Sequence, residues 1–91
     1  MRHARPEDLD QLDDLLAQLR ALPGITEKSR GTFYLKSRAF LHFHEDPAGL
    51  FADIRDAAGV DFERIAVTEA AGRARLVALA RERLTGKSSF S

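Results

Sequence analysis

The chain has 91 residues, of which 44% are hydrophobic and 31% are charged, a balance that indicates one small globular domain and excludes disordered and collagen-like chains. Fourteen basic and fourteen acidic residues leave no net charge, which argues against a protein that acts mainly on nucleic acid. The lack of cysteine excludes disulfides, thiolate nucleophiles and thiolate metal sites.

The first expected element is an amphipathic helix over residues 6–22. Pro6 suits a first helical position, where no backbone hydrogen bond is lost. Leucines recur at three- and four-residue spacing, as on the buried face of a helix; they are Leu9, Leu12, Leu16 and Leu19. Pro23 and Gly24 end the helix. Residues 1–5 are expected to be a frayed tail, and residues 25–31 a polar loop.

The middle of the chain predicts an antiparallel meander. Its three strands are expected at residues 32–36, 39–44 and 50–54, with turns at Ser37-Arg38 and at residues 46–49. After a break at residues 56–59, residues 63–67 fit either a fourth strand or the start of the last helix. Ile65 and Val67 alternate with polar positions, which favours the strand.

A second helix is expected from Thr68 or Glu69 to Leu84, followed by a frayed tail over residues 87–91. The order of helix, three or four strands and helix predicts a single α+β domain over residues 1–91, a two-layer sandwich with both helices on one face of the sheet. The longest apolar run, residues 76–80, is too short to cross a membrane. We therefore expect a cytoplasmic protein.

The second hairpin can be tested by its two faces. If Glu45 pairs with Leu50, one face is wholly apolar and forms the core side; it carries Leu41, Phe43, Leu50, Ala52 and Ile54. The opposite face then mixes aromatic and polar side chains; it carries Phe40, His42, His44, Phe51, Asp53 and Arg55. A first hairpin that turns at Ser37-Arg38 adds Phe33 and Leu35 to this second face.

Large apolar side chains outside the main core need a cover. A loop of the chain, a second copy of the chain or a small-molecule ligand would each supply one. The leading expectation is a non-catalytic binding or interaction domain that forms a homodimer through this face. The residues expected to form the partner- or ligand-binding face are Phe33, Phe40, His42, His44, Phe51 and Asp53.

A metal site is the first alternative. His42 and His44 are two residues apart on a strand, so both rings project from one face, and Asp53 is expected opposite His42. Two imidazoles and a carboxylate are ligands for zinc or another divalent transition metal, and would support a metal-binding protein or a small metal-dependent enzyme. The purely structural alternative is that His42 and Asp53 form an ordinary polar pair across two neighbouring strands. His3 lies in the expected tail and receives no role.

A nucleic-acid-binding module is the second alternative. Basic residues gather in the last helix and the first loop; the candidates are Lys28, Arg30, Arg73, Arg75, Arg81 and Arg83. The last helix has a basic bias and the first helix an acidic one, which also fits two neighbouring helices of complementary charge.

Two segments carry a family resemblance. Residues 22–27 (LPGITE) and 33–40 (FYLKSRAF) resemble the start of small bacterial proteins of the MmcQ/YjbR-like group. The run from Phe40 to His44, followed by residues 50–53, is similar to luciferase-domain proteins. The resemblance covers residues 7–55 and implies a compact α+β fold with a curled antiparallel sheet, but no reaction. For the YjbR-like group it implies a DNA-binding role on fold grounds alone.

Overall fold

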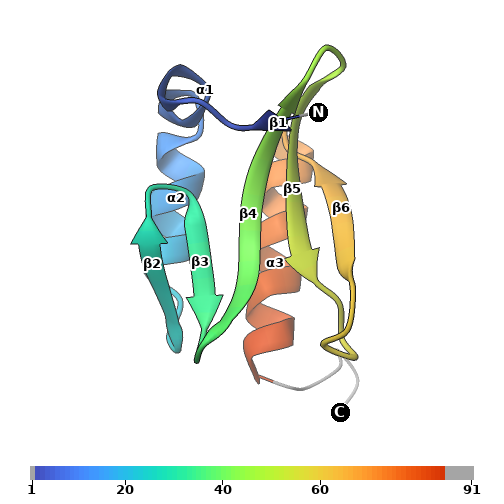
Figure 1. The fold of residues 1–91 in the computed structure, drawn as a ribbon. Helices are drawn as coiled ribbons and strands as arrows, with labels where there is room; N and C mark the ends of the chain where they lie inside the picture. The colour runs from blue at the N-terminus through green and yellow to red at the C-terminus, as the bar shows by residue number, and fades with distance from the viewer. Residues whose placement is uncertain (1, 86–91) are drawn as a thin grey trace.

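The computed structural model describes residues 2–85 and shows an α+β sandwich (Figure 1). The helices are α1 (Pro6–Asp10), α2 (Asp13–Arg20) and α3 (Ala70–Thr85). The strands are β1 (Arg2–His3), β2 (Ile25–Ser29), β3 (Thr32–Leu35), β4 (Arg38–Asp46), β5 (Gly49–Arg55) and β6 (Phe62–Ala66). The predicted fold class is confirmed, although the sheet has six strands rather than three or four.

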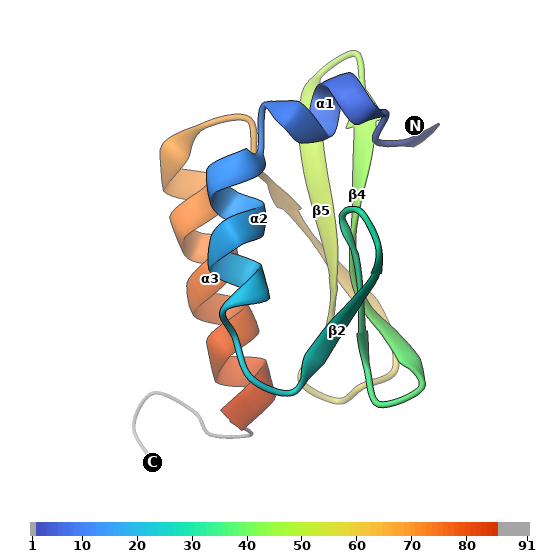
Figure 2. The same ribbon diagram turned by 90° about the vertical axis from the view of Figure 1, so that its left-hand side faces the viewer.

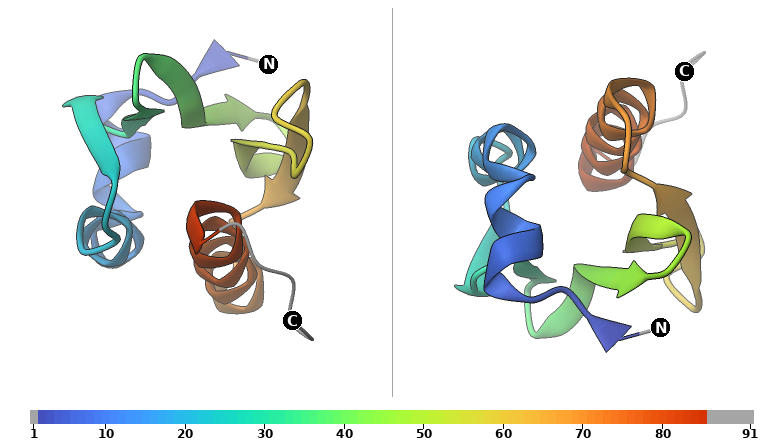
Figure 3. Two further views of the ribbon diagram at one scale, coloured as in Figure 1. Left: turned by 90° about the horizontal axis from the view of Figure 1, so that it is seen from below. Right: turned by 90° about the horizontal axis from the view of Figure 1, so that it is seen from above.

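The sheet is antiparallel throughout, in the order β2-β3-β4-β5-β6. It curves around α2 and α3, which lie side by side on its concave face (Figure 3). Strand β4 is long enough for one of its edges to pair with two elements, β3 near Arg38 and β1 near His44. The short helix α1 crosses the end of the sheet at which the chain begins (Figure 2).

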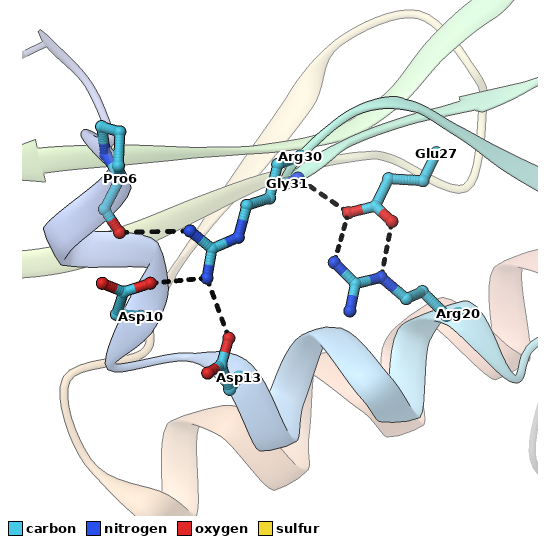
Figure 4. Close-up of polar contacts among 7 residues, drawn as sticks. All are labelled: Pro6, Asp10, Asp13, Arg20, Glu27, Arg30 and Gly31. Carbon is cyan, nitrogen blue, oxygen red and sulfur yellow. Dashed lines mark hydrogen bonds and ion pairs between the residues drawn. The ribbon is translucent and has the colours of Figure 1, made fainter.

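The N-terminal helix is interrupted. Residues 6–22 are mostly helical as predicted, but α1 ends at Asp10 and α2 begins at Asp13. Leu12 has a non-helical backbone, and its side chain is buried together with that of Leu9. Arg30 donates to both Asp10 and Asp13 across the break (Figure 4). Because of this break, the buried leucines can pack against two surfaces, the end of the sheet and the face of α3.

The expected loop over residues 25–31 is instead strand β2, an edge strand paired with β3. Among residues 25–28, Ile25 is the single large apolar side chain. The segment therefore lacks the alternation of apolar and polar residues by which a strand is recognised. Its Glu27 accepts hydrogen bonds from Arg20 of α2 and from the backbone N–H of Gly31 (Figure 4). These contacts hold the edge strand against the helix.

The β4–β5 register is confirmed in full. Glu45 pairs with Leu50, Phe43 with Ala52, and Leu41 with Ile54. The predicted core face is buried beneath the helices, because every one of its five side chains belongs to the hydrophobic core. The fourth predicted strand is also confirmed as β6, which pairs with β5.

Two phenylalanines do not lie where the sequence pattern placed them. Phe33 pairs with Leu41 and Tyr34 with Ala39, which leaves Phe40 as the extra residue of a β-bulge. Phe33 therefore shares the core face of Leu41 and is 1% exposed; Phe40 is 2% exposed and also packs in the core. The prediction that both lie on the second face, exposed to a partner or ligand, is wrong because a bulge shifts the alternation of side chains.

The turn predicted at Ser37-Arg38 is also one residue too late. Leu35 pairs with Arg38, so the turn is at residues 36–37. Leu35 therefore packs against the core rather than on the second face.

The expected frayed tail over residues 1–5 is wrong for Arg2 and His3, which form β1 opposite Glu45 and His44. The tail predicted for residues 87–91 lies outside the described residues. Within residues 2–85, none of the helices is both long and apolar enough to cross a membrane. The last helix follows the prediction closely and buries Leu76, Val77 and Ala80.

Candidate functional site

Three histidines meet on the sheet face that points away from α2 and α3. His42 and His44 project from β4 on the side opposite Leu41 and Phe43, as the alternation of a strand requires. His3 of β1 pairs directly with His44. Two strands that are far apart in the sequence therefore bring three imidazoles onto one surface, which we call the histidine cluster.

The rings of the histidine cluster are in contact with one another. The centroid distances are 4.8 Å between His42 and His44, 5.2 Å between His3 and His44, and 6.0 Å between His3 and His42. One nitrogen from each ring can be chosen so that all three lie within 4.8 Å of one another. His3 is exposed, whereas the other two are half-buried. The cluster thus opens to solvent on the β1 side.

Asp53 is committed to an arginine. It lies opposite His42 in the register, as predicted, but its carboxylate reaches His44, with 3.0 Å between Oδ2 and Nε2. Arg64 of β6 donates to both carboxylate oxygens of Asp53, at 2.9 and 3.2 Å. Burial by itself would raise the pKa of Asp53, but the bonds and charge of Arg64 outweigh it and the pKa is lowered. The carboxylate is therefore charged and held in place beside His44.

Several ring nitrogens of the cluster have no hydrogen-bond partner within the described part of the chain. These are Nδ1 of His42 and both nitrogens of His44, all of them buried. The contact between His44 Nε2 and Asp53 is close, but its geometry is not that of a hydrogen bond. Burial, together with the neighbouring His44, lowers the pKa of His42, so its imidazole is neutral near pH 7 and keeps a lone pair. Buried polar atoms without partners call for an explanation.

Aromatic side chains border the cluster. Phe62 of β6 lies edge-on to His42, with 5.0 Å between ring centroids, and Arg55 lies 4.3 Å from the centre of the Phe62 ring. Phe62 is 38% exposed. Phe51, half-buried, pairs with His44 on the same face. The predicted second face thus keeps His42, His44, Phe51, Asp53 and Arg55, and has lost Phe33 and Phe40 to the core.

The basic residues predicted for nucleic-acid binding are mostly engaged within the molecule. Arg30 donates to Asp10 and Asp13, and Lys28 lies 4.6 Å from the centre of the Tyr34 ring. Arg73 donates to the backbone carbonyls just before α3.

Arg75 and Arg83 both approach Glu63 of β6, at 3.7 and 2.8 Å. Arg81 has no ion pair within residues 2–85. Three of these six charges, those of Arg30, Arg75 and Arg83, pair with carboxylates, and Lys28 and Arg73 make other contacts within the molecule, so the structure gives no support to a shared basic surface. The first and last helices are neighbours as expected, since α2 and α3 lie side by side (Figure 3). Their charges do not pair with each other among residues 2–85: Arg20 and Arg30 link α1 and α2 to the β2–β3 hairpin, and two arginines of α3 pair with β6.

Sequence reasoning missed three residues of this site. His3 joins it only because β1 pairs with β4, and a two-residue strand leaves no periodic signal. Arg64 and Phe62 belong to β6, and extending the register from β5 to β6 would have placed Arg64 opposite Asp53.

Comparison with models of protein families, with curated proteins and with solved structures finds no match to this chain. The resemblance to the MmcQ/YjbR-like and luciferase-domain proteins therefore stays a prediction. The geometry of the histidine cluster has to carry the functional argument.

Proposed function

We propose that this protein binds a divalent transition-metal ion through the imidazoles of His3, His42 and His44. The observation that carries the proposal is the convergence of three rings, two of which, His42 and His44, hold buried nitrogens that lack hydrogen-bond partners among the described residues. His3 replaces Asp53, the third ligand expected from the sequence pattern, because Arg64 already bonds both oxygens of that carboxylate.

The spacing of the cluster is close to that of a metal site. Metal–nitrogen distances of about 2.0–2.1 Å in a tetrahedral site place the ligand nitrogens roughly 3.4 Å apart. The nitrogens here lie within 4.8 Å of one another. Small side-chain rotations would have to bring these nitrogens closer together, and the exposed ring of His3 is the one with most freedom to turn. The proposed ligand set thus consists of two half-buried imidazoles and one exposed imidazole.

Asp53 acts in this proposal as a positioning residue. Metal-bound histidines usually give their second nitrogen to a carboxylate or a carbonyl, which fixes the tautomer and the ring orientation. His44 Nε2 lies 3.0 Å from Asp53 without the geometry of a hydrogen bond; in this proposal a small turn of the ring on metal binding would form that bond and leave Nδ1 for the metal. Arg64 holds the carboxylate in turn, so the chain from Arg64 through Asp53 to His44 orients one ligand.

The ligand chemistry narrows the choice of ion. Neutral imidazole nitrogens suit zinc, copper, nickel and cobalt, whereas magnesium and calcium prefer oxygen ligands. Three protein ligands leave one position of a tetrahedral zinc site for water or another donor. The proposal therefore describes an open site at the surface of the sheet.

Zinc titration followed by calorimetry tests the proposal. We expect about one ion per chain, with a dissociation constant of roughly a micromolar or tighter. The chain contains three histidines, so His42→Gln and His44→Gln together should abolish saturable binding and His3→Gln should weaken it. Glu69→Gln, an exposed carboxylate change at the start of α3, is the control and should bind as the parent does. Saturable zinc binding that survives the double variant would contradict the proposal.

Homodimerisation through the same face stays a prediction. It is supported by the exposed side chains of Phe62, at 38%, and Val60, at 68%, and it is weakened by the burial of Phe33 and Phe40. Light scattering after size-exclusion chromatography, with and without zinc, separates a metal-dependent dimer from a monomer. Cytoplasmic location likewise stays a prediction.

A further inference from the structure

A pocket lies at the other end of β4, away from the histidine cluster. It has a volume of about 530 Å³ and lies between the β3–β4 turn, the loop after β5 and the last turns of α3. Its wall includes Leu35, Ala39, Phe40 and Ala57, which are apolar, and Lys36, Arg38 and Arg55, which are basic. None of these residues belongs to the histidine cluster, so the pocket is a separate candidate site.

The charges around the pocket do not cancel. Lys36, Arg38 and Arg55 have no carboxylate partner among residues 2–85. The carboxylate of Asp56 accepts the backbone N–H groups of Val60 and Asp61, so it is turned to its own loop. Arg83 pairs with Glu63, and Glu82 is the remaining acid of the wall. The pocket therefore combines mostly apolar walls with a net positive electrostatic potential.

The two arginines are held in place by the backbone. Arg55 donates to the carbonyls of Ala39 and Val60, and Arg38 donates through one terminal nitrogen to the carbonyl of Gly59. Arg38 keeps its other N–H groups free of bonds within the described chain. Guanidinium groups fixed before a ligand arrives lose little freedom when it binds.

Lys36 adds a strained backbone to this arrangement. Its φ is 60°, and it is the one non-glycine residue with positive φ among residues 2–85. It is the first residue of the two-residue loop between β3 and β4, a position where positive φ ordinarily selects glycine. Residues with strained backbones persist only where the surrounding structure holds them, and they cluster at active sites and ligand sites. A lysine at this position places a positive charge at the wall of the pocket, at a cost in backbone strain that glycine would avoid.

We propose that this pocket binds a small organic anion with an apolar body, such as an aromatic or medium-chain carboxylate. Its volume lies within the range of small-molecule sites, which combine mostly apolar walls with a few polar groups. Lys36 and Arg38 would hold the carboxylate, Arg55 would supply fixed positive charge, and Phe40 and Leu35 would contact the apolar body. The bulge at Phe40 that removed this side chain from the second face also brings it to the pocket wall.

Titration of ¹⁵N-labelled protein with 2-naphthoate, in a buffer that contains a metal chelator, tests the proposal. We expect saturable shifts of the amides of residues 35–40 and 55–59. The neutral 2-naphthamide should bind about tenfold more weakly, and inorganic phosphate, which has no apolar body, should also bind weakly. Equal binding of the acid and the amide, saturable shifts confined to other residues, or no saturable shift at millimolar naphthoate would overturn it.

Two variants and a control sharpen this test. Lys36→Gly relieves the backbone strain, so it should fold at least as stably as the parent and yet bind naphthoate about tenfold more weakly. Arg38→Gln should weaken binding to a similar extent. Lys28→Ala removes the same charge from β2, outside the pocket, and should leave binding unchanged. Unchanged affinity in both Lys36→Gly and Arg38→Gln would contradict the assignment. Failure here would leave the histidine site unaffected, because the two sites share no residue.

Discussion

Asp53 contacts both an arginine on β6 and a histidine on β4. Arg64 bonds both oxygens, and Oδ2 also lies 3.0 Å from His44 Nε2. The side chain of Asp53 is 11% exposed, so its charge would be costly to bury without Arg64. The residue thus links the stability of the sheet face to the orientation of one candidate metal ligand.

Asp53→Asn should weaken zinc binding without removing a ligand. An amide cannot supply the same charge to His44, and the loss of such a second partner typically lowers metal affinity by about 10- to 100-fold. Calorimetry measures the affinity, with Asp61→Asn as the control for a carboxylate on a nearby exposed loop. If Asp53→Asn bound zinc as tightly as the parent, Asp53 would have no part in orienting His44.

The ionisation of Glu27 is expected to make the stability of the fold at the β2 edge decrease as the pH falls. The hydrogen bonds from Arg20 lower the pKa of Glu27 below its ordinary value of 4.5, against the opposing effect of burial. A lowered pKa adds stability above the unfolded-state value, and this stability is lost as the pH falls through the folded-state value. Thermal unfolding midpoints should therefore fall less between pH 6 and pH 3 in Glu27→Gln than in the parent. Equal falls would show that this ion pair contributes nothing.

At the scale of elements, the close approach of α3 to β6 depends on Gly72. A Cβ built there would lie 1.9 Å from the backbone oxygen of Ala66. Alanine is favoured over glycine in a helix by about 1 kcal/mol, but backbone cannot yield as a flexible side chain would. The clash should therefore outweigh the helical preference.

Gly72→Ala is accordingly expected to destabilise the fold by about 1–3 kcal/mol, the usual range for overpacking. Ala78→Gly, at an exposed position of the same helix, is the control and should cost about 1 kcal/mol through propensity alone. Urea unfolding measures both. A Gly72→Ala variant more stable than the parent would show that helix propensity, not the contact with Ala66, decides at this position.

The bulge in β4 makes a second prediction at this scale. Phe40 is 2% exposed and lies in the core, whereas Phe62 is 38% exposed. Phe40→Ala should cost about 3–5 kcal/mol of unfolding free energy, and Phe62→Ala should cost clearly less. Urea unfolding compares the two variants directly. Similar costs would mean that Phe40 lies on the outer face, as simple alternation suggests.

The alternation of apolar and polar residues explains which strands could be predicted from the sequence. The β4–β5 register follows from residues 41–54, because a slip of one residue would place apolar side chains on the wrong face. The bulge at Phe40 leaves no such mark, since an apolar residue fits either face there. Strand β2 has too few apolar side chains, and β1 is too short, to show a period. Each of these two edge strands makes an ion pair that its own sequence pattern does not reveal, Arg20 with Glu27 for β2 and Arg2 with Glu45 for β1.

For the molecule as a whole, the candidate site could be predicted only where its residues lie on one hairpin. His42, His44 and Asp53 were brought together from sequence because they lie on one hairpin of known register. His3 was not, because its position depends on a pairing across about forty residues of chain. The pocket near Lys36 was not predictable either, since it is formed by two turns and the end of a helix. Sites within one hairpin can be read from a sequence, and sites between elements cannot.

At this scale the molecule has two candidate sites at opposite ends of β4, one rich in imidazole and one rich in cations. The central claim is that three imidazoles form one metal centre. X-ray absorption at the zinc edge of the protein with one equivalent of zinc tests it most directly. We expect nitrogen neighbours at about 2.0–2.1 Å with the outer-shell scattering of about three imidazole rings. A first shell of oxygen alone, without imidazole scattering, would contradict the claim.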